Sequence, residues 1–321
     1  MKTINMKPYF FHDGIKVLAE KFKGTENIYL GIRPYGFHAG NQLPFMVYPM
    51  LLCQEIEKLG KKASFTFYVF INDWEQYQLD GPDPKRYPFN IYPLGSTFQY
   101  TKLPGDQQTG IVDHWHPIIE NAVRESLSKF PSVSVKSVRN SDMKQMGEMK
   151  RILIETIKNP NLVADVLAEH TNTTVLPTPR IYALAVCPKC QQVNGHSEVL
   201  TDGSISHQCD ACKQKSNGSY EDFDYWFYHK PLALPRISIF NIDLCITGAD
   251  HYREGDFIVR QKLFESYKLK NKLPLTLYTQ TVYGKDGQVM GKSKKNDVYL
   301  DPKYLYQKVI NNNSDKLLLE E

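Results

Sequence analysis

The sequence lacks any apolar run that approaches the ~20 residues that a membrane-spanning helix needs. Its first residues, MKTINMKPYFFHDG, also lack the apolar stretch of a secretory signal peptide. No charge of one sign dominates, because 39 Lys and Arg residues against 35 Asp and Glu residues leave a net charge of +4. These absences argue against a membrane span, and they permit a nucleic-acid partner without demanding one. We therefore expect a cytoplasmic protein that has no membrane partner.

Cysteine is scarce, and four of the six cysteines form two C-x-x-C pairs, Cys187 with Cys190 and Cys209 with Cys212. The segment between the pairs contains an Asp-Gly dipeptide that is typical of a hairpin turn. In a reducing compartment, this doubled spacing favours metal binding over disulfides or redox thiols. Four thiolates form the closed tetrahedral set of a structural Zn²⁺ site. The sequence therefore predicts a zinc-ribbon insertion over 186–222.

Two short apolar runs bounded by turn residues, 27–32 and 64–71, have the composition of buried strands. Between them, residues 43–59 show helical apolar spacing, with Pro44 near the start and Gly60 just past the end. A strand, a glycine-containing loop, a helix and a second strand make a βαβ unit, which is the seed of a parallel sheet. We predict an α/β protein built on such a sheet.

The rest of the chain has no internal repeat and reads as a single domain over 1–320. The elements that its periodicity predicts are a helical insertion over 116–170, a return to the sheet at 236–246, a helix over 256–269, a strand over 274–282 and a last helix from about 302.

Three short motifs follow predicted strands, where ligands bind parallel sheets. The first is HAGN, in which Gly40 allows close backbone approach, His38 can donate to a phosphate oxygen and Asn41 can reach a ribose or a base. The second is NDWE, residues 72–75. The third is GADH, residues 248–251, whose glycine leaves room for a ribose and whose aspartate can accept hydrogen bonds from hydroxyls. Each motif could equally be an ordinary polar loop.

A lysine cluster, MGKSKKN, occupies residues 290–296 near the end of the chain. It contains Lys292 and Ser293, and it is either an ordinary solvated loop or a loop that holds a phosphate. Together with HAGN, NDWE, the cysteine segment and GADH, it stands in an order that resembles the motifs of class I aminoacyl-tRNA synthetases. The resemblance is strongest to the class I type of lysyl-tRNA synthetase, which has H-I-G-N-like, G-x-D-H and K-M-S-K-S motifs and a cysteine-rich zinc insertion.

This resemblance covers roughly residues 10 to 300 and implies a Rossmann-like nucleotide-binding fold. It also implies activation of an amino acid by ATP to aminoacyl-AMP, followed by transfer to tRNA or another acceptor. Catalysis would fall to His38 and Lys292, and Mg²⁺ would accompany the ATP. The implied ATP-binding residues are His38, Gly40, Asn41, Gly248, Asp250, His251, Lys292 and Ser293. The implied amino-acid-binding residues are Asn72, Asp73 and Glu75, with one carboxylate available for the substrate's ammonium group.

Two departures from the family pattern keep alternatives open. Val289 and Gly291 replace the first lysine and the middle serine of the K-M-S-K-S motif, and we expect no anticodon-binding domain because one predicted helix follows this motif. The acceptor could then be a tRNA acceptor end or a different molecule. One alternative is a nucleotidyltransferase that acts on a non-amino-acid substrate. The other is a non-catalytic, nucleic-acid-binding paralogue of a synthetase.

Overall fold

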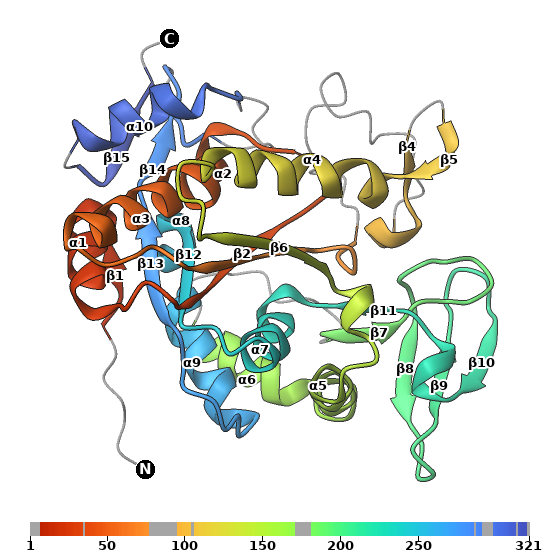
Figure 1. The fold of residues 1–321 in the computed structure, drawn as a ribbon. Helices are drawn as coiled ribbons and strands as arrows, with labels where there is room; N and C mark the ends of the chain where they lie inside the picture. Colours follow the sequence, from red (N-terminus) through yellow and green to blue (C-terminus); the bar gives the residue numbers. More distant parts are fainter. Residues whose placement is uncertain are drawn as a thin grey trace.

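A parallel β-sheet is the centre of the fold in the computed structural model, which describes residues 7–34, 36–76, 95–103, 106–170, 181–285, 287–290, 298–312 and 314–319 (Figure 1). Six described strands form this sheet in the order β1-β13-β12-β2-β3-β6, and each neighbouring pair is parallel. They are β1 (Tyr9–Phe10), β2 (Asn27–Ile32), β3 (Thr66–Ile71), β6 (Ser134–Arg139), β12 (Leu244–Gly248) and β13 (Leu275–Thr279). The predicted parallel sheet is confirmed.

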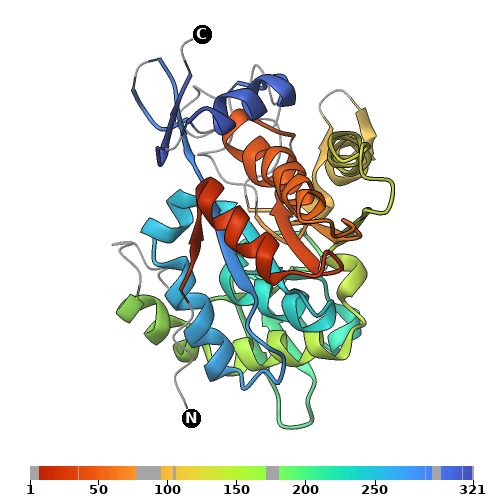
Figure 2. The same ribbon diagram turned by 60° about the vertical axis from the view of Figure 1, so that its left-hand side comes forward.

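Helices cover both faces of this sheet because its inner strands are apolar on both sides. Ile28, Leu30 and Ile32 of β2 belong to one core cluster, whereas Tyr29 of β2 and Phe70 of β3 pack into the other. The helices of the first cluster are α1 (Phe11–Lys21), α3 (Tyr48–Lys58), α4 (Ile111–Ser126) and α10 (Pro302–Ile310). Those of the second are α5 (Gly147–Lys158), α6 (Pro160–His170), α7 (His229–Ile239) and α9 (Asp256–Ser266). Figure 2 shows α1 and α3 side by side in front of the sheet.

The strand order places a switch point between β2 and β12. From β2 the sheet extends through β3 and β6, whereas from β12 it extends the opposite way through β13 and β1. The loops that leave the carboxyl ends of β2 and β12 therefore diverge, which opens a crevice where parallel sheets bind ligands. The HAGN motif follows β2, and the GADH motif begins at the end of β12.

The helix predicted after β2 forms, but in three parts. A short α2 (Ala39–Gln42) leads into a π-helical segment (Leu43–Val47) and then into α3. Pro44 and Pro49 account for the irregularity, because a proline has no N–H to donate and displaces the regular hydrogen-bond ladder. The helix ends as predicted at Gly60, whose φ of 71° suits a residue just past a helix end.

The segment 116–170 differs from the expected helical insertion. It contains β6, which is a strand of the main sheet, between α4 and α5. The helical pattern that follows is two helices, α5 and α6, separated at Pro160. A six-residue strand whose exposed face is polar gives little periodicity beside two amphipathic helices, so the sequence pattern did not reveal it.

Two further segments differ from expectation. The run 236–246 begins in α7 and returns to the sheet only at β12, because a short apolar run does not distinguish a buried helix from a strand. The last helix, α10, is followed by β15 (Lys316–Leu318), which pairs with β14 (Thr281–Tyr283). Among the described residues, no helix is both long enough and apolar enough to cross a bilayer.

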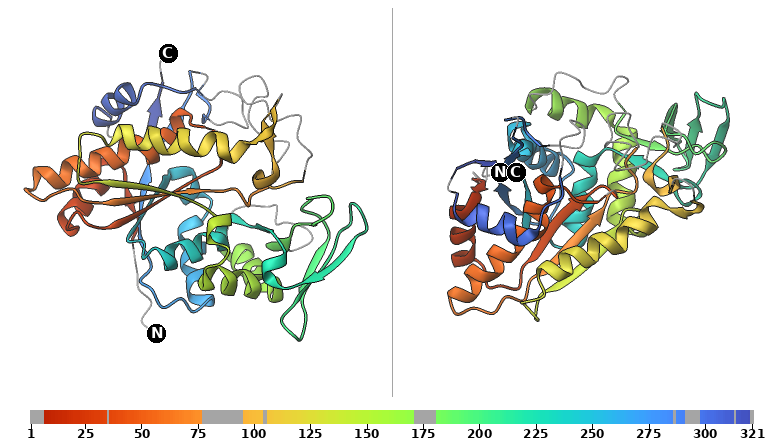
Figure 3. Two further views of the ribbon diagram at one scale, coloured as in Figure 1. Left: turned by 45° about the vertical axis from the view of Figure 1, so that its right-hand side comes forward. Right: turned by 90° about the horizontal axis from the view of Figure 1, so that it is seen from above.

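The cysteine segment forms a small antiparallel sheet at the edge of the molecule (Figure 3). Its strands are β8 (His196–Val199), β9 (Ile205–Gln208) and β10 (Lys215–Gly218), and the predicted Asp-Gly turn joins the first two. The other short strands are β4 (Lys102–Leu103), β5 (Asp106–Gly110), β7 (Ala183–Ala185) and β11 (Tyr225–Phe227), and the helix α8 covers Ala249–Arg253. Single 3₁₀ turns occur at Phe98–Tyr100, Ser141–Met143 and Tyr220–Asp222.

Asp73, directly after β3, ties that strand to the turn after β6. Its side chain is 1% exposed and accepts hydrogen bonds from the backbone N–H of Asn140 at 2.9 Å and the hydroxyl of Ser141 at 2.5 Å. Burial raises the pKa of Asp73 to about 6, although these hydrogen bonds favour the charged form and oppose the shift.

We predict that the Asp73 carboxyl carbon titrates near pH 6 in a ¹³C NMR experiment. Because the folded-state pKa is raised, protonation of Asp73 stabilises the fold fully below about pH 4 and loses that effect as the pH rises through 6. The unfolding free energy of Asp73→Asn relative to the wild type should therefore rise by about 2 kcal/mol between pH 4 and 6. Urea unfolding at several pH values measures this difference, and a difference that does not change with pH contradicts the assignment.

Candidate active site and metal centre

A cavity of about 620 Å³ lies at the switch point of the sheet. Its walls come from β2, α2, α7, α8, α9, β12 and the segment before the lysine cluster. Of the residues predicted from sequence, those that line it are His38, Gly40, Asn41, Asn72, Glu75, Gly248, Asp250 and His251. Asp73 does not line the cavity, because its side chain points to the turn after β6 and accepts hydrogen bonds from it.

A reciprocal pair of hydrogen bonds shapes the first turn of α2. The Nδ1 atom of His38 accepts from the backbone N–H of Gly40 at 3.2 Å, and the side-chain oxygen of Asn41 accepts from the backbone N–H of His38 at 2.6 Å. A Cβ on Gly40 would lie 2.9 Å from the His38 ring, so a glycine is needed here. Since Nδ1 accepts, the neutral ring carries its proton on Nε2 and is a donor there. The Nε2 proton of His38 is therefore the donor that this turn offers to an anion.

The lysine cluster lies outside the described residues from 291 to 297, and Lys292 and Ser293 are among them. The residues on either side are described, and both contact α2. The Met290 carbonyl lies 3.9 Å from the position that a Cβ would take on the second residue of α2, and Met290 lines the cavity. The backbone N–H of the first residue of α2 donates to the Val298 carbonyl at 2.7 Å. The connection that carries the lysines thus starts and ends beside HAGN.

The opposite wall is the GADH turn between β12 and α8. The carboxylate of Asp250 folds back over Gly248, where an added Cβ would lie only 2.3 Å from its Oδ1 atom. Any larger residue would displace this carboxylate from the wall of the cavity. His251 lies next in the chain, and its Nδ1 atom is 3.8 Å from a carboxylate oxygen of Glu254, which also lines the cavity.

The third wall joins β2 to the NDWE motif. Glu75 forms an ion pair with Arg33 and accepts a 2.6 Å hydrogen bond from the side-chain amide of Asn72. Burial acts to raise the pKa of Glu75, but the charge and the hydrogen bond of Arg33, together with the charge of Arg236, outweigh it and hold that pKa below its ordinary value. Glu75 is therefore a carboxylate at neutral pH.

The sequence pattern did not identify six charged residues that line the cavity, and two of these, Arg33 and Glu254, belong to the walls described above. Lys230 and Arg236 come from α7, which was expected to be partly a strand, and Asp256 and Arg260 come from α9. The available signal was the pair of cations within the apolar run HKPLALPRISIF, because Lys and Arg are almost never fully buried without partners.

Arg236 is 1% exposed and links β2 to the segments that follow β3 and β6. Its guanidinium donates to the hydroxyl of Tyr29 at 2.7 Å, to the side-chain oxygen of Asn72 at 2.5 Å and to the side-chain oxygen of Asn140. Tyr29 belongs to β2, Asn72 follows β3 and Asn140 follows β6. This one side chain therefore positions Asn72, and through it Glu75, relative to the sheet.

A charge cluster completes the wall beside Arg236. Asp256 pairs with Lys230 at 2.8 Å and with Arg260 at 2.7 Å. Burial acts to raise the pKa of Asp256, but Arg260 and Lys230 outweigh it and hold the pKa far below its ordinary value. Next to Lys230, burial lowers the pKa of His229 to about 4, so this imidazole is neutral at pH 7.

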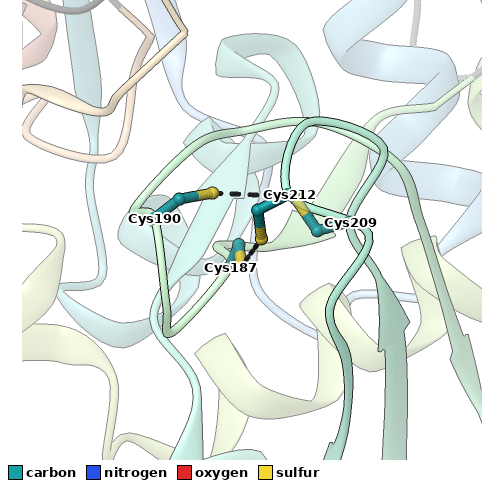
Figure 4. A group of neighbouring side chains, drawn as sticks. All are labelled: Cys187, Cys190, Cys209 and Cys212. Atoms are coloured by element: carbon teal, nitrogen blue, oxygen red, sulfur yellow. Dashed lines mark hydrogen bonds between the residues drawn. The ribbon is translucent and has the colours of Figure 1, made fainter.

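Cys187, Cys190, Cys209 and Cys212 lie together at the base of the small sheet, with their sulfurs directed toward one another (Figure 4). All four sulfurs lie within 4.8 Å of one another, and the Cys187–Cys212 and Cys190–Cys209 pairs are each 3.6 Å apart. A tetrahedral ion with Zn–S bonds of about 2.3 Å needs sulfurs about 3.8 Å apart, so the set fits such an ion. The predicted Cys₄ cluster is confirmed, and it could hold a metal ion.

Comparison with protein families gives one match, to the family described as tRNA synthetases class I (K), over residues 23–310. A comparison with curated proteins found no match. Among solved structures, the chain is similar to tyrosyl-tRNA synthetase from Archaeoglobus fulgidus, with 14% identity, a TM-score of 0.41, and coverage of 93% of this chain and 69% of that one.

Two other structures show the same level of likeness. One is a glutamate tRNA ligase from Elizabethkingia meningosepticum, with 12% identity, a TM-score of 0.35, and coverage of 84% of this chain and 52% of that one. The other is tryptophanyl-tRNA synthetase from Campylobacter jejuni, with 14% identity, a TM-score of 0.36, and coverage of 89% and 65%. This chain therefore spans between 52% and 69% of the length of these three proteins.

We predict that the purified protein contains about one zinc ion per chain, because four converging thiolates bind zinc tightly and binding contributes to folding. Cys209→Ser should lower both the metal content, measured by mass spectrometry of the elements, and the midpoint of thermal unfolding. Cys53→Ala is the matched control, because Cys53 is a buried thiol outside the cluster. A wild-type protein that carries no zinc and does not respond to a chelator would disprove this role.

Proposed function

Because the chain belongs to the family of class I (K) tRNA synthetases, we propose that it activates an amino acid with ATP and transfers the aminoacyl group to an acceptor. The observation that carries this proposal is the convergence on one cavity of three segments far apart in the sequence. These are the HAGN turn, the GADH turn and Met290 at the start of the lysine cluster. An anion-binding turn and a hydroxyl-accepting carboxylate on facing walls suit the phosphates and ribose of ATP.

In the proposed reaction, a carboxylate oxygen of the amino acid attacks the α-phosphorus of ATP. The bond from that phosphorus to the bridging oxygen breaks, which gives aminoacyl-AMP and pyrophosphate. His38 donates from Nε2 to a phosphate oxygen, and Gly40 lets the phosphates approach the backbone beside Asn41. Lys292 and Ser293 hold the departing pyrophosphate, whose charge grows in the transition state. Mg²⁺ enters with ATP and offsets part of its charge.

Gly248 and Asp250 hold the ribose in this proposal, with the carboxylate accepting from its hydroxyls, and His251 orients it. The amino acid lies against Glu75 and Asn72, where the carboxylate of Glu75 accepts the α-ammonium group. We give Asp73 a positioning role, because it fixes the turn after β6 and does not line the cavity. The acceptor is either a tRNA acceptor end or another molecule with a nucleophilic group.

The ion pair between Arg33 and Glu75 favours a second candidate function. A carboxylate that already has a cationic partner is less available to an α-ammonium group. A nucleotidyltransferase that adenylates an acid without this ammonium group would use the same nucleotide walls. Amino-acid-dependent exchange of pyrophosphate into ATP separates the two candidates, because only the first requires an amino acid.

We predict that ATP–pyrophosphate exchange requires an amino acid and proceeds without tRNA. Lys292→Ala should lower kcat by about 10²-fold with a much smaller effect on the KM for ATP, because Lys292 acts mainly in the transition state. Lys158→Ala is the control, since Lys158 is an exposed lysine at the end of α5. Unchanged turnover in Lys292→Ala would show that the lysine cluster is an ordinary solvated loop.

We also predict that His38→Ala lowers the kcat of exchange by roughly 10²-fold, because it removes the donor at Nε2. The KM for the amino acid should stay nearly constant, since His38 lies on the nucleotide side of the cavity. His196→Ala removes an exposed histidine of the small sheet and serves as the control. If only the KM for ATP rises in His38→Ala, then His38 contacts ATP in the ground state and has no catalytic part.

A further inference from the structure

The inner pocket of the cavity contains cations whose hydrogen-bonding capacity the protein does not use up. We define this pocket by Tyr29, Arg33, Asn72, Glu75, His229, Lys230, Arg236, Asp256 and Arg260, all of which line the cavity. It lies where β2, α7 and α9 meet, on the side of the amino acid in the proposed function.

Lys230 is the first of these cations. The residue is 8% exposed, and among the described residues its ammonium has a single partner, the carboxylate of Asp256 at 2.8 Å. An ammonium group has three donor hydrogens, so two remain for a ligand in the cavity. A buried ammonium with unused donors is costly unless an acceptor is supplied.

Arg236 is the second. Every acceptor that it has among the described residues is uncharged, namely the hydroxyl of Tyr29 and the side-chain oxygens of Asn72 and Asn140. No carboxylate of the described chain lies within ion-pair distance of this guanidinium. Its positive charge is therefore buried beside the pocket without a carboxylate in direct contact, and Asp73 and Glu75 act on it only from beyond ion-pair distance.

The carboxylates near these cations already have partners. Glu75 pairs with Arg33, and Asp256 pairs with both Lys230 and Arg260. Asp73 lies near Arg236 but accepts its hydrogen bonds from the turn after β6 and does not line the cavity. With Glu75 assigned to an α-ammonium group, the second carboxylate of the described pocket is Asp256, which already holds two cations and so is not available to a cationic side chain.

Two other carboxylates line the cavity, Asp250 and Glu254, and both lie on the ribose wall. The neutral His229 adds no charge of either sign at pH 7. The inner pocket therefore presents Lys230 and Arg236 as its available charged groups. A ligand anion would satisfy the remaining donors of Lys230 and compensate the charge of Arg236, whereas a ligand cation would be repelled by both.

We propose that the inner pocket binds an anionic group on the far end of the substrate, so that the activated molecule is a dicarboxylic amino acid or a close relative of it. The proposal rests on the proposed function for the identity of the reaction, but the binding of the anion stands by itself. It contrasts with a lysine-like substrate, whose ammonium would need a free carboxylate that the described part of this pocket lacks.

The first test compares matched substrates in ATP–pyrophosphate exchange. Aspartate and glutamate are set against their uncharged amides, asparagine and glutamine, and against lysine and arginine. We expect one of the two acids to exceed its own amide and both basic amino acids by about 100-fold or more in kcat/KM, since a site built for a charged group rejects the analogue that lacks it. Preference for lysine, arginine or an amide overturns the inference and leaves the proposed function in place.

The second test measures binding without catalysis. A ligand that binds the native protein raises its thermal midpoint, so aspartate, glutamate and glutarate are compared with glutamine and lysine at equal concentration in the presence of ATP. A rise with at least one of the three acids and none with glutamine or lysine supports the inference. If the acids cause no rise, the inference is overturned. A rise with an acid but no exchange with any amino acid overturns the proposed function alone.

A variant links the preference to the pocket. Lys230→Met should raise the KM for the preferred acid by about 10-fold or more and leave the KM for ATP unchanged. The matched control is Lys150→Met, which removes a lysine from an exposed ion pair with Glu221 far from the cavity. An unchanged KM for the acid in folded Lys230→Met overturns the inference, and if that variant does not fold, the two wild-type tests decide.

Discussion

The guanidinium of Arg236 is the group on which the inner end of the site depends. It reaches from α7 to β2 and to the ends of β3 and β6, so one buried cation connects four elements that are distant in the sequence. A buried charge of this kind is stable only while its hydrogen bonds are intact, so each partner is held in one position. Asn72 is one of these partners, and it in turn holds Glu75 at the wall of the cavity. The geometry of that wall therefore follows from the hydrogen bonds that the buried guanidinium of Arg236 requires.

The nucleotide side of the cavity is built on a different basis. The two side-chain hydrogen bonds of the HAGN turn join residues no more than three positions apart, and Asp250 folds over a glycine two positions before it. Such turns are nearly self-contained, and the sheet has only to bring them together. The switch point between β2 and β12 does so, because it places the two carboxyl ends at one crevice. The site thus combines two turns that form locally with one network of charged residues that forms only when the chain is folded.

The elements that could be predicted from sequence are those with strong local signals. β2 and β3 were predicted from apolar composition, the end of the α3 helix from Gly60, and the zinc-ribbon hairpin from its Asp-Gly turn and paired cysteines. The elements that were missed have weak or ambiguous local patterns. β6 is a short strand with a polar face, and α7 is a buried helix whose apolar run resembles a strand. Because the missed α7 carries Lys230 and Arg236, the charged wall of the cavity was missed with it.

The sequence by itself determined the chemistry that depends on close spacing, namely the four thiols of the cysteine cluster, the HAGN turn and the glycine that lets Asp250 fold back. These contacts form between residues that are neighbours in the chain or in one hairpin, so their spacing specifies them. Only the tertiary structure decided which charges are paired. Arg33 meets Glu75 across two strands, Lys230 meets Asp256 across two helices, and the hydrogen-bond partners of Arg236 in the described part of the chain are all uncharged. The net charge of a buried pocket depends on residues that are distant in the sequence and come together only by packing. The spacing of residues within one segment therefore cannot predict it.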